Sequence, residues 1–408
     1  MEKTVRLAAR QVGTLLRQPR NARVTASDEN PPMRVRLVDP PAYTPPYDHA
    51  LAAALLRAGV AVELSTSRPT YDAPAPDDGV VMREDFYRRA MARDRSTNVR
   101  RALRLAEHLP DMLRHRRNGG RGVDVVHYQW LTLEALDAAL LVRGAPRVFT
   151  SHNVLRRGGG RLREAGPRRV ADAVDAVVVH TRAGARAMTD RYGADPARVH
   201  VIPHGAFDYL ASQPHETPLP PELAAVDKPV ILSFGVLRPY KGIDVLVDAF
   251  AGIEGAELWI VGRPWMDVAP LRAAAAHAGG TVRFVDRFVA ENELPAYFRR
   301  ADVVALPYRD IDQSGVLYTA LAFGKAIVAS SIGGFAEVAE DHRALVPVPA
   351  GDAAALRTAL AELVDDPAAR TAQEARAAAA AAGPYSWDEA ARLTMALYQR
   401  LVSKSLMT

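Results

Sequence analysis

The chain has 408 residues, more than one ordinary hydrophobic core accommodates, so its length favours two domains. Hydrophobic residues make up 49% of it and charged residues 24%, a composition that excludes an intrinsically disordered protein. The lack of cysteine excludes disulfide bonds and thiolate metal sites, and the formal net charge of +5 suits an anionic ligand, an anionic membrane surface or nucleic acid without choosing among them.

Residues 1–32 are predicted to be an N-terminal basic arm and linker. Apolar residues between positions 5 and 16 recur at helical spacing, with lysine and arginine elsewhere. The segment 1–20 is therefore either a basic helix in peripheral contact with an anionic membrane or an arm without fixed structure. No apolar run approaches the roughly 20 residues of a membrane span, and no signal-peptide segment is visible. We expect a cytoplasmic protein, with any membrane contact at the inner face.

Strands and helices alternate over residues 33–205, which predicts a first, parallel doubly wound α/β domain. It opens with a strand at 35–38, a helix at 50–58 and a strand at 60–64. Residues 83–117 predict a basic helical region whose arginines mostly form a solvated face. Further strands are predicted at 123–126, 147–150, 176–179 and 199–202.

Polar residues recur where these strands end, which is where open α/β sheets bind ligands. One histidine at such a position is more often structural. Five of them favour a binding role for some members of the set. The five are His49, His127, His152, His180 and His204.

Residues 230–250 carry the strongest local signal in the chain. The apolar run 230–234 predicts a strand, and the apolar spacing from Ile243 onward predicts a helix. The turn between them presents Arg238 and Lys241. A helix N-terminus favours anions, and a guanidinium and an ammonium beside it make a site for a phosphate group. A solvated basic loop is the alternative interpretation of this stretch by itself.

The same alternation continues over residues 206–383, which predicts a second doubly wound domain. An Ala-rich helix is predicted at 353–382. A last amphipathic helix at 387–403 follows the break at Gly383-Pro384. The other strands are predicted at 257–261, 282–285, 303–306 and 327–329.

The second domain resembles the retaining family-four glycosyltransferases (glycosyltransferase group 1), which have the GT-B fold of two doubly wound Rossmann-like domains facing a central cleft. The resemblance is strong over residues 230–340 and extends to the rest of the chain as layout. The matching motifs are Phe234-Gly235, Arg238-Pro-Tyr-Lys241-Gly242, Leu258-Trp-Ile-Val-Gly262, Val282-Arg-Phe284, Glu293-Leu294, Ala301-Asp302-Val303, Leu306-Pro307, Ala320-Leu-Ala-Phe-Gly324-Lys325, and Gly333-Gly334 with Glu337.

The resemblance implies an enzyme that moves a hexose from a nucleoside-diphosphate sugar to a hydroxyl, with retention at the anomeric carbon and with no metal or cofactor. The acceptor is expected to be a glycan, a lipid-linked intermediate or a secondary metabolite, as in polysaccharide biosynthesis. The family places the donor in the second domain and the acceptor mainly in the first, and residues 384–408 are expected to pack on the first domain. Asp310-Ile-Asp312 spells the Asp-x-Asp of metal-dependent transferases of another fold, but a bare three-residue match is a weak signal.

The resemblance also implies roles for individual residues. Arg238 and Lys241 are expected to stabilise the departing diphosphate, and His152 to face the transferred sugar and acceptor. Arg287 and Phe288 lie where the family holds the nucleobase. The other expected donor contacts are Gly235, Gly262, His204, Gln313, Ser314, Gly315, Val316 and Thr319. The expected acceptor-side contacts are Tyr47, His49, His127, Gln129, Trp130 and Asn153.

Several positions depart from the family pattern. Ile311 and Thr319 stand in place of a Glu-x7-Glu pair, whose second member usually holds the donor ribose. Val236 replaces the usual arginine, and Tyr43-Thr-Pro-Pro-Tyr47 replaces a Gly-Gly loop. The alternative is therefore a catalytically silent GT-B homologue that binds a glycan or a partner. The retained cations and His152 argue for activity.

Two other classes are disfavoured. No Gly-x-Gly-x-x-Gly follows a predicted strand with an acidic residue about 20 positions on, which argues against a nicotinamide-dependent dehydrogenase. Nucleic-acid binding is suggested by charge alone, without an aromatic-basic platform, so we expect no nucleic-acid partner.

Overall fold

The computed structural model describes residues 31–69, 79–92, 97–154, 161–213 and 215–407. The predicted N-terminal membrane segment, residues 1–20, lies outside these ranges. Residues from Met33 onward form one compact unit with two parallel sheets. Within the described residues, no helix combines the length and the apolar content that crossing a membrane requires.

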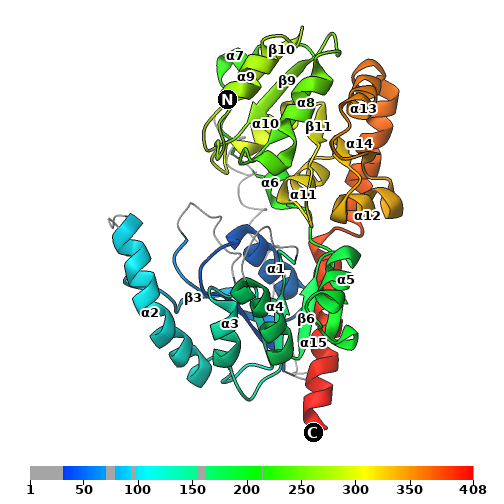
Figure 1. Cartoon of the computed structure of the whole chain (residues 1–408). Coiled ribbons are helices and arrows are strands. Elements are labelled where there is room, and N and C mark those ends of the chain that lie inside the picture. The colour runs from blue at the N-terminus through cyan, green and yellow to red at the C-terminus, as the bar shows by residue number, and fades with distance from the viewer. Residues whose placement is uncertain (1–30, 70–78, 93–96, 155–160, 214, 408) are drawn as a thin grey trace, which may run out of the picture. The chain divides into compact units, whose positions relative to one another are not determined.

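The first sheet has seven parallel strands in the order β3-β2-β1-β4-β5-β6-β7 (Figure 1). Its strands are β1 (Arg34–Asp39), β2 (Ala61–Thr66), β3 (Val81–Glu84), β4 (Val125–Tyr128), β5 (Arg147–Thr150), β6 (Ala176–Val179) and β7 (Val199–Val201). The helices of this part of the chain are α1 (Pro45–Arg57), α2 (Thr97–Asn118), α3 (Glu134–Asp137), α4 (Arg161–Ala173) and α5 (Arg182–Asp190).

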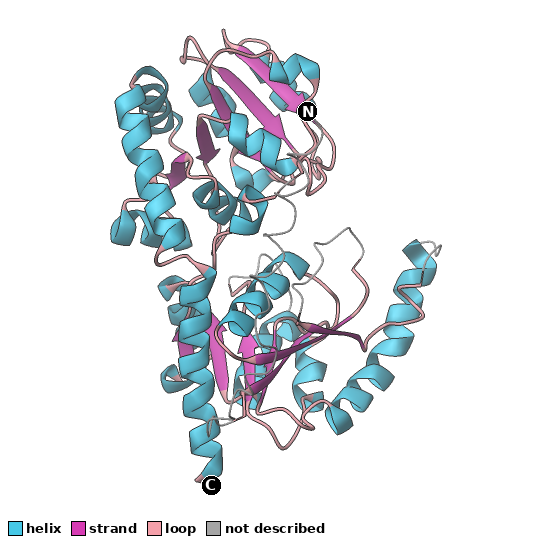
Figure 2. Ribbon diagram, turned by 180° about the vertical axis from the view of Figure 1, so that it is seen from behind, coloured by secondary structure: helices cyan, strands magenta, loops and turns pink. Residues whose placement is uncertain are grey.

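The second sheet has six parallel strands in the order β10-β9-β8-β11-β12-β13, and helices cover both of its faces (Figure 2). Its strands are β8 (Val230–Phe234), β9 (Glu257–Val261), β10 (Thr281–Val285), β11 (Val303–Leu306), β12 (Ala326–Ser330) and β13 (Val346–Val348). The helices are α6 (Asp208–Ala211), α7 (Pro221–Ala224), α8 (Ile243–Phe250), α9 (Ala269–Ala275), α10 (Leu294–Arg300), α11 (Gly315–Ala322), α12 (Gly333–His342), α13 (Ala353–Asp365), α14 (Pro367–Ala382) and α15 (Trp387–Leu406).

These two sheets confirm the predicted pair of doubly wound α/β units, while the domain boundaries at 205/206 and 383/384 stay predictions. The strand order reverses between β1 and β4 in one sheet and between β8 and β11 in the other. Ligands of such sheets bind outside the carboxyl ends of the strands at this reversal. The cationic turn after β8 is therefore at the expected place.

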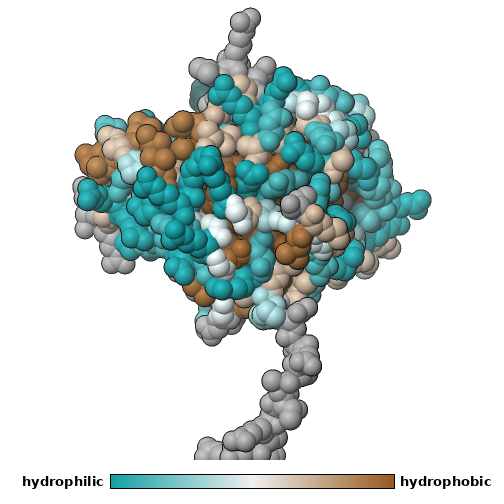
Figure 3. Space-filling view, turned by 90° about the horizontal axis from the view of Figure 1, so that it is seen from below, coloured by the Kyte–Doolittle hydropathy of each residue, from teal (hydrophilic) through white to brown (hydrophobic). Residues whose placement is uncertain are grey.

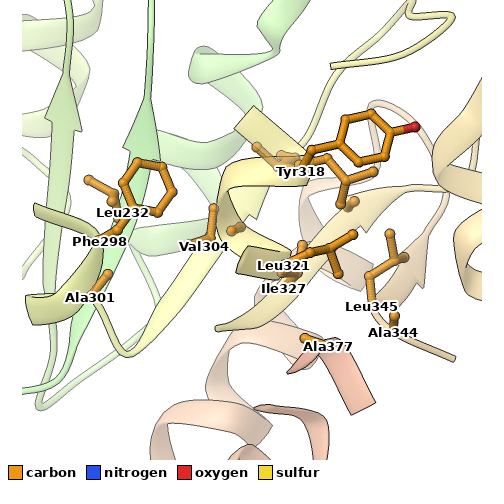
Figure 4. Close-up of a cluster of buried hydrophobic side chains, with 14 of the residues drawn as sticks. Leu232, Phe298, Ala301, Val304, Tyr318, Leu321, Ile327, Ala344, Leu345 and Ala377 are labelled. Atoms are coloured by element: carbon orange, nitrogen blue, oxygen red, sulfur yellow. The ribbon is translucent and has the colours of Figure 1, made fainter. Parts of the chain in front are cut away.

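The continuous apolar runs of the strands follow from burial on both faces. In β8, Val230 and Leu232 belong to the core on one face of the second sheet, and Ile231 belongs to the core on the other. Figure 4 shows the first of these cores, in which Leu232 lies near Phe298. The strand is thereby fixed on both sides, and so is the start of the turn that follows it.

The C-terminal helix α15 packs on the first sheet's half of the molecule, as predicted. Trp387 and Leu397 share a hydrophobic core with Leu51 of α1. The buried hydroxyl of Tyr398 lies 2.6 Å from His127 Nδ1 at the end of β4. The chain thus returns from the second sheet to close the core of the first.

The structure differs from the sequence-based boundaries in places where proline sets a helix start. Helix α1 begins at Pro45 rather than at residue 50, because two prolines occupy its first two positions, where no intrahelical N–H is needed. The predicted helix at 353–382 is two helices, since Asp366 caps α14 and Pro367 begins it. Strand β3 was not predicted.

We predict that Tyr398→Phe lowers the free energy of unfolding by about 1–3 kcal/mol, because it leaves a buried imidazole nitrogen without a partner. Chemical denaturation measures this change. Tyr43→Phe, which alters a solvent-exposed tyrosine, serves as the control and is expected to change stability by less than about 0.5 kcal/mol. Equal effects of the two substitutions would contradict the bracing role of the His127–Tyr398 contact.

Candidate functional site

The turn after β8 is built around two close backbone approaches. Gly235 has a positive φ of 97°, and a Cβ there would lie 2.8 Å from Lys241 Nζ. Gly262 follows β9 with a φ of 146°, and a Cβ on it would lie 2.2 Å from the carbonyl oxygen of Gly235. A side chain is therefore excluded at both positions. The backbone of Gly235 and Gly262 and the ammonium of Lys241 come together at the end of the sheet.

Lys241 is buried, and its ammonium donates a hydrogen bond of 2.8 Å to the carbonyl oxygen of Phe234. Burial lowers the pKa of Lys241 to about 8; Tyr240 acts in the opposite direction and the Arg238 charge adds to the lowering. At neutral pH the side chain is still mostly protonated. A positive charge is therefore held where water screens it poorly.

Arg238 is held by an aromatic ring rather than by a carboxylate. Its guanidinium carbon lies 4.2 Å from the ring centroid of the exposed Trp265. Backbone bonds hold the two segments together, since Leu237 N donates to Arg263 O and Trp265 N donates to Leu237 O, each at 2.9 Å. No described carboxylate lies within ion-pair distance of Arg238. Its N–H groups are therefore available to an anion.

Trp265 is a residue that the sequence reasoning missed. It follows the Gly262-Arg263-Pro264 segment that ends β9. The sequence shows only a tryptophan three positions after Gly262, just beyond a predicted strand. That position does not indicate which cation the ring contacts.

The N-terminus of α11 faces the same point. A Cβ on Gly235 would lie 3.3 Å from Val316 Cγ2, so the first turn of α11 is beside the ammonium. Ser314 occupies the N-cap position, but its side chain does not cap the helix. The first N–H groups of a helix have no intrahelical acceptor and attract anions. Two cations and a helix N-terminus that starts at Gly315 thus converge.

Five residues that the sequence analysis singled out, together with Trp387 of α15, meet in a ring cluster. We define this cluster as Tyr47, Trp130, His152, His180, His204 and Trp387. The Tyr47 ring lies 4.6 Å from that of His152 and 4.9 Å from that of His204. Trp130 stacks on His152 with a centroid distance of 5.0 Å. His204 stacks on Tyr318 of α11 at 4.3 Å. The cluster therefore joins the strand ends of the first sheet to the helix that faces the cationic turn.

A chain of contacts fixes the tautomers in this cluster. His180 donates from Nδ1 to Ile202 O at 2.9 Å, so its Nε2 accepts from His152 Nδ1 at 3.3 Å. His152 Nε2 is then an acceptor, 3.3 Å from the Gln129 amide. The network is complete when that amide presents its NH2 group, which otherwise has no described partner. Both nitrogens of His152 are thereby used inside the protein.

The cluster is uncharged at neutral pH. Burial holds the pKa values of His152 and His204 well below the ordinary 6.5 and lowers that of His180 to about 4. The neighbouring histidines add to the lowering at His152 and His204. Positive charge at this junction therefore comes from the turn after β8 and not from imidazolium groups.

The loop before α11 connects the two sheets. Gln313 Nε2 donates to His152 O at 3.3 Å. Asp312 accepts from Thr181 Oγ1 at 2.8 Å and from Val154 N at 3.3 Å. Burial raises the pKa of Asp312, and the Thr181 hydrogen bond opposes this effect. Both oxygens of Asp312 are thus used to join the sheets, and the described residues contain no group of three side chains suited to a metal ion.

A second carboxylate ties the same place. Glu337 of α12 accepts from the backbone N–H groups of Arg182 and Ala183 at 2.8 Å each. Both N–H groups belong to the first turn of α5. Arg182 also pairs with Asp341. Carboxylates at a helix N-terminus are stabilising. Sequence reasoning had matched Glu337 to a family motif without predicting this contact.

Several predicted residues are not open to a ligand as the structure stands. Both nitrogens of the buried His127 are used, by Tyr398 and by Thr150 Oγ1 at 2.7 Å. Thr319 is buried, and its hydroxyl donates to Gly315 O at 2.9 Å. His127 is therefore placed in the packing of α15, and Thr319 in that of α11.

The remaining predicted residues make none of the contacts described above. Arg287 pairs with Glu293 at 2.6 Å, and Phe288 beside it is exposed at the end of β10. A cavity of about 480 Å³ adjoins them and includes Arg287 in its lining. Asn153 is exposed after β5, and His49 is partly buried on α1.

Comparison with known proteins identifies relatives of both halves. The sequence matches the family model "Glycosyl transferases group 1" over residues 228–366 and the model "Glycosyltransferase Family 4" over residues 47–206. It is 31% identical to a D-inositol 3-phosphate glycosyltransferase of Kineococcus radiotolerans, over 86% of this chain and 89% of that protein. It is 32% identical to the protein of the same name from Xylanimonas cellulosilytica, over 71% and 74%.

Solved structures show the same fold. Sucrose-phosphate synthase from Thermosynechococcus elongatus superposes with a TM-score of 0.68 at 20% identity, covering 91% of this chain and 100% of the other. Anabaena HepE, solved in complex with UDP and glucose, superposes with a TM-score of 0.67 at 17% identity, covering 90% and 100%.

We predict that Trp265→Ala weakens the binding of a nucleoside diphosphate several-fold, because the loss of a cation–π contact of about 0.5–2 kcal/mol frees the Arg238 side chain. Calorimetric titration measures the affinity, and Trp265→Phe should keep most of it. In an Arg238→Ala background the same substitution should have little further effect. An undiminished loss in that background would mean that the ring acts on the ligand directly.

Proposed function

Since this chain is a member of glycosyltransferase family 4 and has the GT-B fold, we propose that it transfers a hexose from a nucleoside-diphosphate sugar to a hydroxyl acceptor with retention at the anomeric carbon. We further propose that the reaction needs no metal, because groups of the chain itself supply positive charge at the diphosphate. The observation that carries the proposal is the convergence of Arg238, Lys241 and the α11 N-terminus beside Gly235.

The chemistry explains why charge is needed there. When the bond between the anomeric carbon and the diphosphate oxygen breaks, its electron pair stays on that oxygen, which becomes more negative. Cations fixed at that oxygen stabilise the transition state more than the ground state, and this difference accelerates the reaction. Arg238 can offer paired N–H groups, and the buried Lys241 acts as a point charge.

Retention is proposed to occur without a protein nucleophile. The acceptor oxygen attacks the face that the diphosphate leaves, and the departing diphosphate oxygen takes the acceptor's proton. The carboxylates that join the sheets, Asp312 and Glu337, are engaged by donors around α5. We propose that the neutral His152 positions the sugar at the junction of the sheets. Its backbone carbonyl accepts from Gln313 and its ring stacks on Trp130, so its position is fixed.

The comparisons support classes of donor and acceptor. Because HepE was solved with UDP and with UDP-glucose, we propose a uridine diphosphate hexose as the first donor to test. The relatives from Kineococcus radiotolerans and Xylanimonas cellulosilytica are named for transfer to an inositol phosphate, which supports a hydroxyl-rich small acceptor. Glycan, lipid-linked and secondary-metabolite hydroxyls belong to the same acceptor panel.

We predict that Arg238→Ala and Lys241→Ala each lower the rate of transfer or donor hydrolysis by about 100-fold or more, the cost of losing one preorganised charge-stabilising group. Release of nucleoside diphosphate from a panel of donors measures the rate. Arg392→Ala removes an exposed arginine that is paired with Glu389 on α15 and should leave the rate unchanged. Nucleotide binding without turnover in the unmodified protein would support the catalytically silent homologue instead.

The pKa of Lys241 predicts a pH dependence. The ammonium is the active form, and its folded-state pKa is lowered to about 8, so the charge is present below that pH and lost above it. The pH dependence of kcat/KM reports the pKa values of the free enzyme. We therefore expect kcat/KM to fall about tenfold for each pH unit above 8, as Lys241 loses its proton. In Lys241→Arg, whatever rate remains should show no such decline, and a decline at the same pH would assign it to another group.

A further inference from the structure

Helix α2 is amphipathic, but its leucines face away from the protein, which is the opposite of the usual arrangement in a surface helix. Its outward face carries a row of leucines four residues apart, with exposed fractions of 66% at Leu105, 46% at Leu109 and 37% at Leu113. Val99, six residues before Leu105 in the first turn of the helix, is also exposed. Figure 3 shows apolar side chains gathered at the left, on the side of the molecule that carries α2. Surface helices ordinarily bury such a row.

Polar groups hold the inward face of α2. His108 contacts Tyr87 OH and Asp137 Oδ1 at 2.7 Å each. His115 Nε2 lies 3.1 Å from Tyr128 OH. Asp111 accepts from Tyr87 N at 2.7 Å. These contacts fix which face of the helix points away from the sheet, so the exposure of the leucines is specified by the fold.

The outward face is cationic as well as apolar. Arg101 and Arg117 are exposed near the two ends of the helix, and no described carboxylate pairs with either. The two acidic residues of α2 are turned away from this face. Glu107 accepts from the N–H groups of Arg89 and Ala90, and Asp111 is buried. An apolar row flanked by arginine and free of acidic side chains complements a surface that is apolar inside and anionic outside.

We propose that α2 docks on an anionic lipid bilayer, lying flat with its leucines at the acyl boundary and its arginines at the lipid phosphates. The charge of the face favours this occupant over two others. A second copy of the same face would place arginine against arginine. The segment 1–20, with more basic than acidic residues, would bring like charge to the same surface. This docking surface is distinct from residues 1–20 and is independent of the proposed reaction.

Co-sedimentation of the full chain with vesicles tests the proposal. The chain should bind phosphatidylcholine vesicles that contain phosphatidylglycerol and should bind pure phosphatidylcholine vesicles far more weakly. The variant Leu105→Gln/Leu109→Gln/Leu113→Gln should lose at least tenfold in partitioning. Arg101→Gln/Arg117→Gln should lose much of the preference for the anionic vesicles.

The matched control is Val201→Gln/Leu406→Gln, which removes exposed apolar side chains from β7 and the end of α15 and should bind as the unmodified chain does. Thermal melting confirms that each variant is folded. Absent binding to anionic vesicles, or equal binding by the triple-leucine variant, would overturn the proposal. So would a dimer in vesicle-free solution that the triple variant dissociates, because a second copy would then be the occupant. Neither readout depends on turnover.

Discussion

The site depends on the buried ammonium of Lys241 and the nearby guanidinium of Arg238, which pairs with no carboxylate among the described residues. Burial and like charge both disfavour this arrangement, and its cost appears in the lowered pKa of Lys241. For this pair the protein provides one backbone carbonyl and two aromatic rings, Trp265 beside Arg238 and Tyr308 beside Lys241, and no described carboxylate. An arriving diphosphate therefore completes an arrangement that is unfavourable without it, and the charge is already oriented when the bond to the sugar breaks.

The rest of the junction keeps other charge away from that place. The histidines of the ring cluster are buried and neutral, and both nitrogens of His152 and His180 are hydrogen-bonded. Asp312 and Glu337 are engaged at α5. These contacts join the two sheets and do not involve the cations of the turn.

The two faces of helix α2 also differ in role: polar side chains attach one face to the protein, and the other face is exposed. Its histidines and Asp111 are bonded to the first sheet's half, which frees its apolar row. A membrane at this face would lie on the half of the molecule for which the sequence predicts the acceptor contacts. Lipid-borne and membrane-proximal hydroxyls would then be the acceptors nearest to the enzyme.

The sequence by itself determined what local patterns encode. The strand, turn and helix from Val230 to Phe250 were predicted correctly, because apolar spacing, glycine and two cations lie within one short stretch. The doubly wound class followed from the alternation of strands and helices. Tertiary structure alone decided that Trp265 supports Arg238, that Asp312 reaches Thr181 across 131 positions, and that His127 meets Tyr398 across 271. It also decided that the leucines of α2 face outward. Periodicity shows that a helix has an apolar face, but which face the fold buries depends on partners distant in the chain.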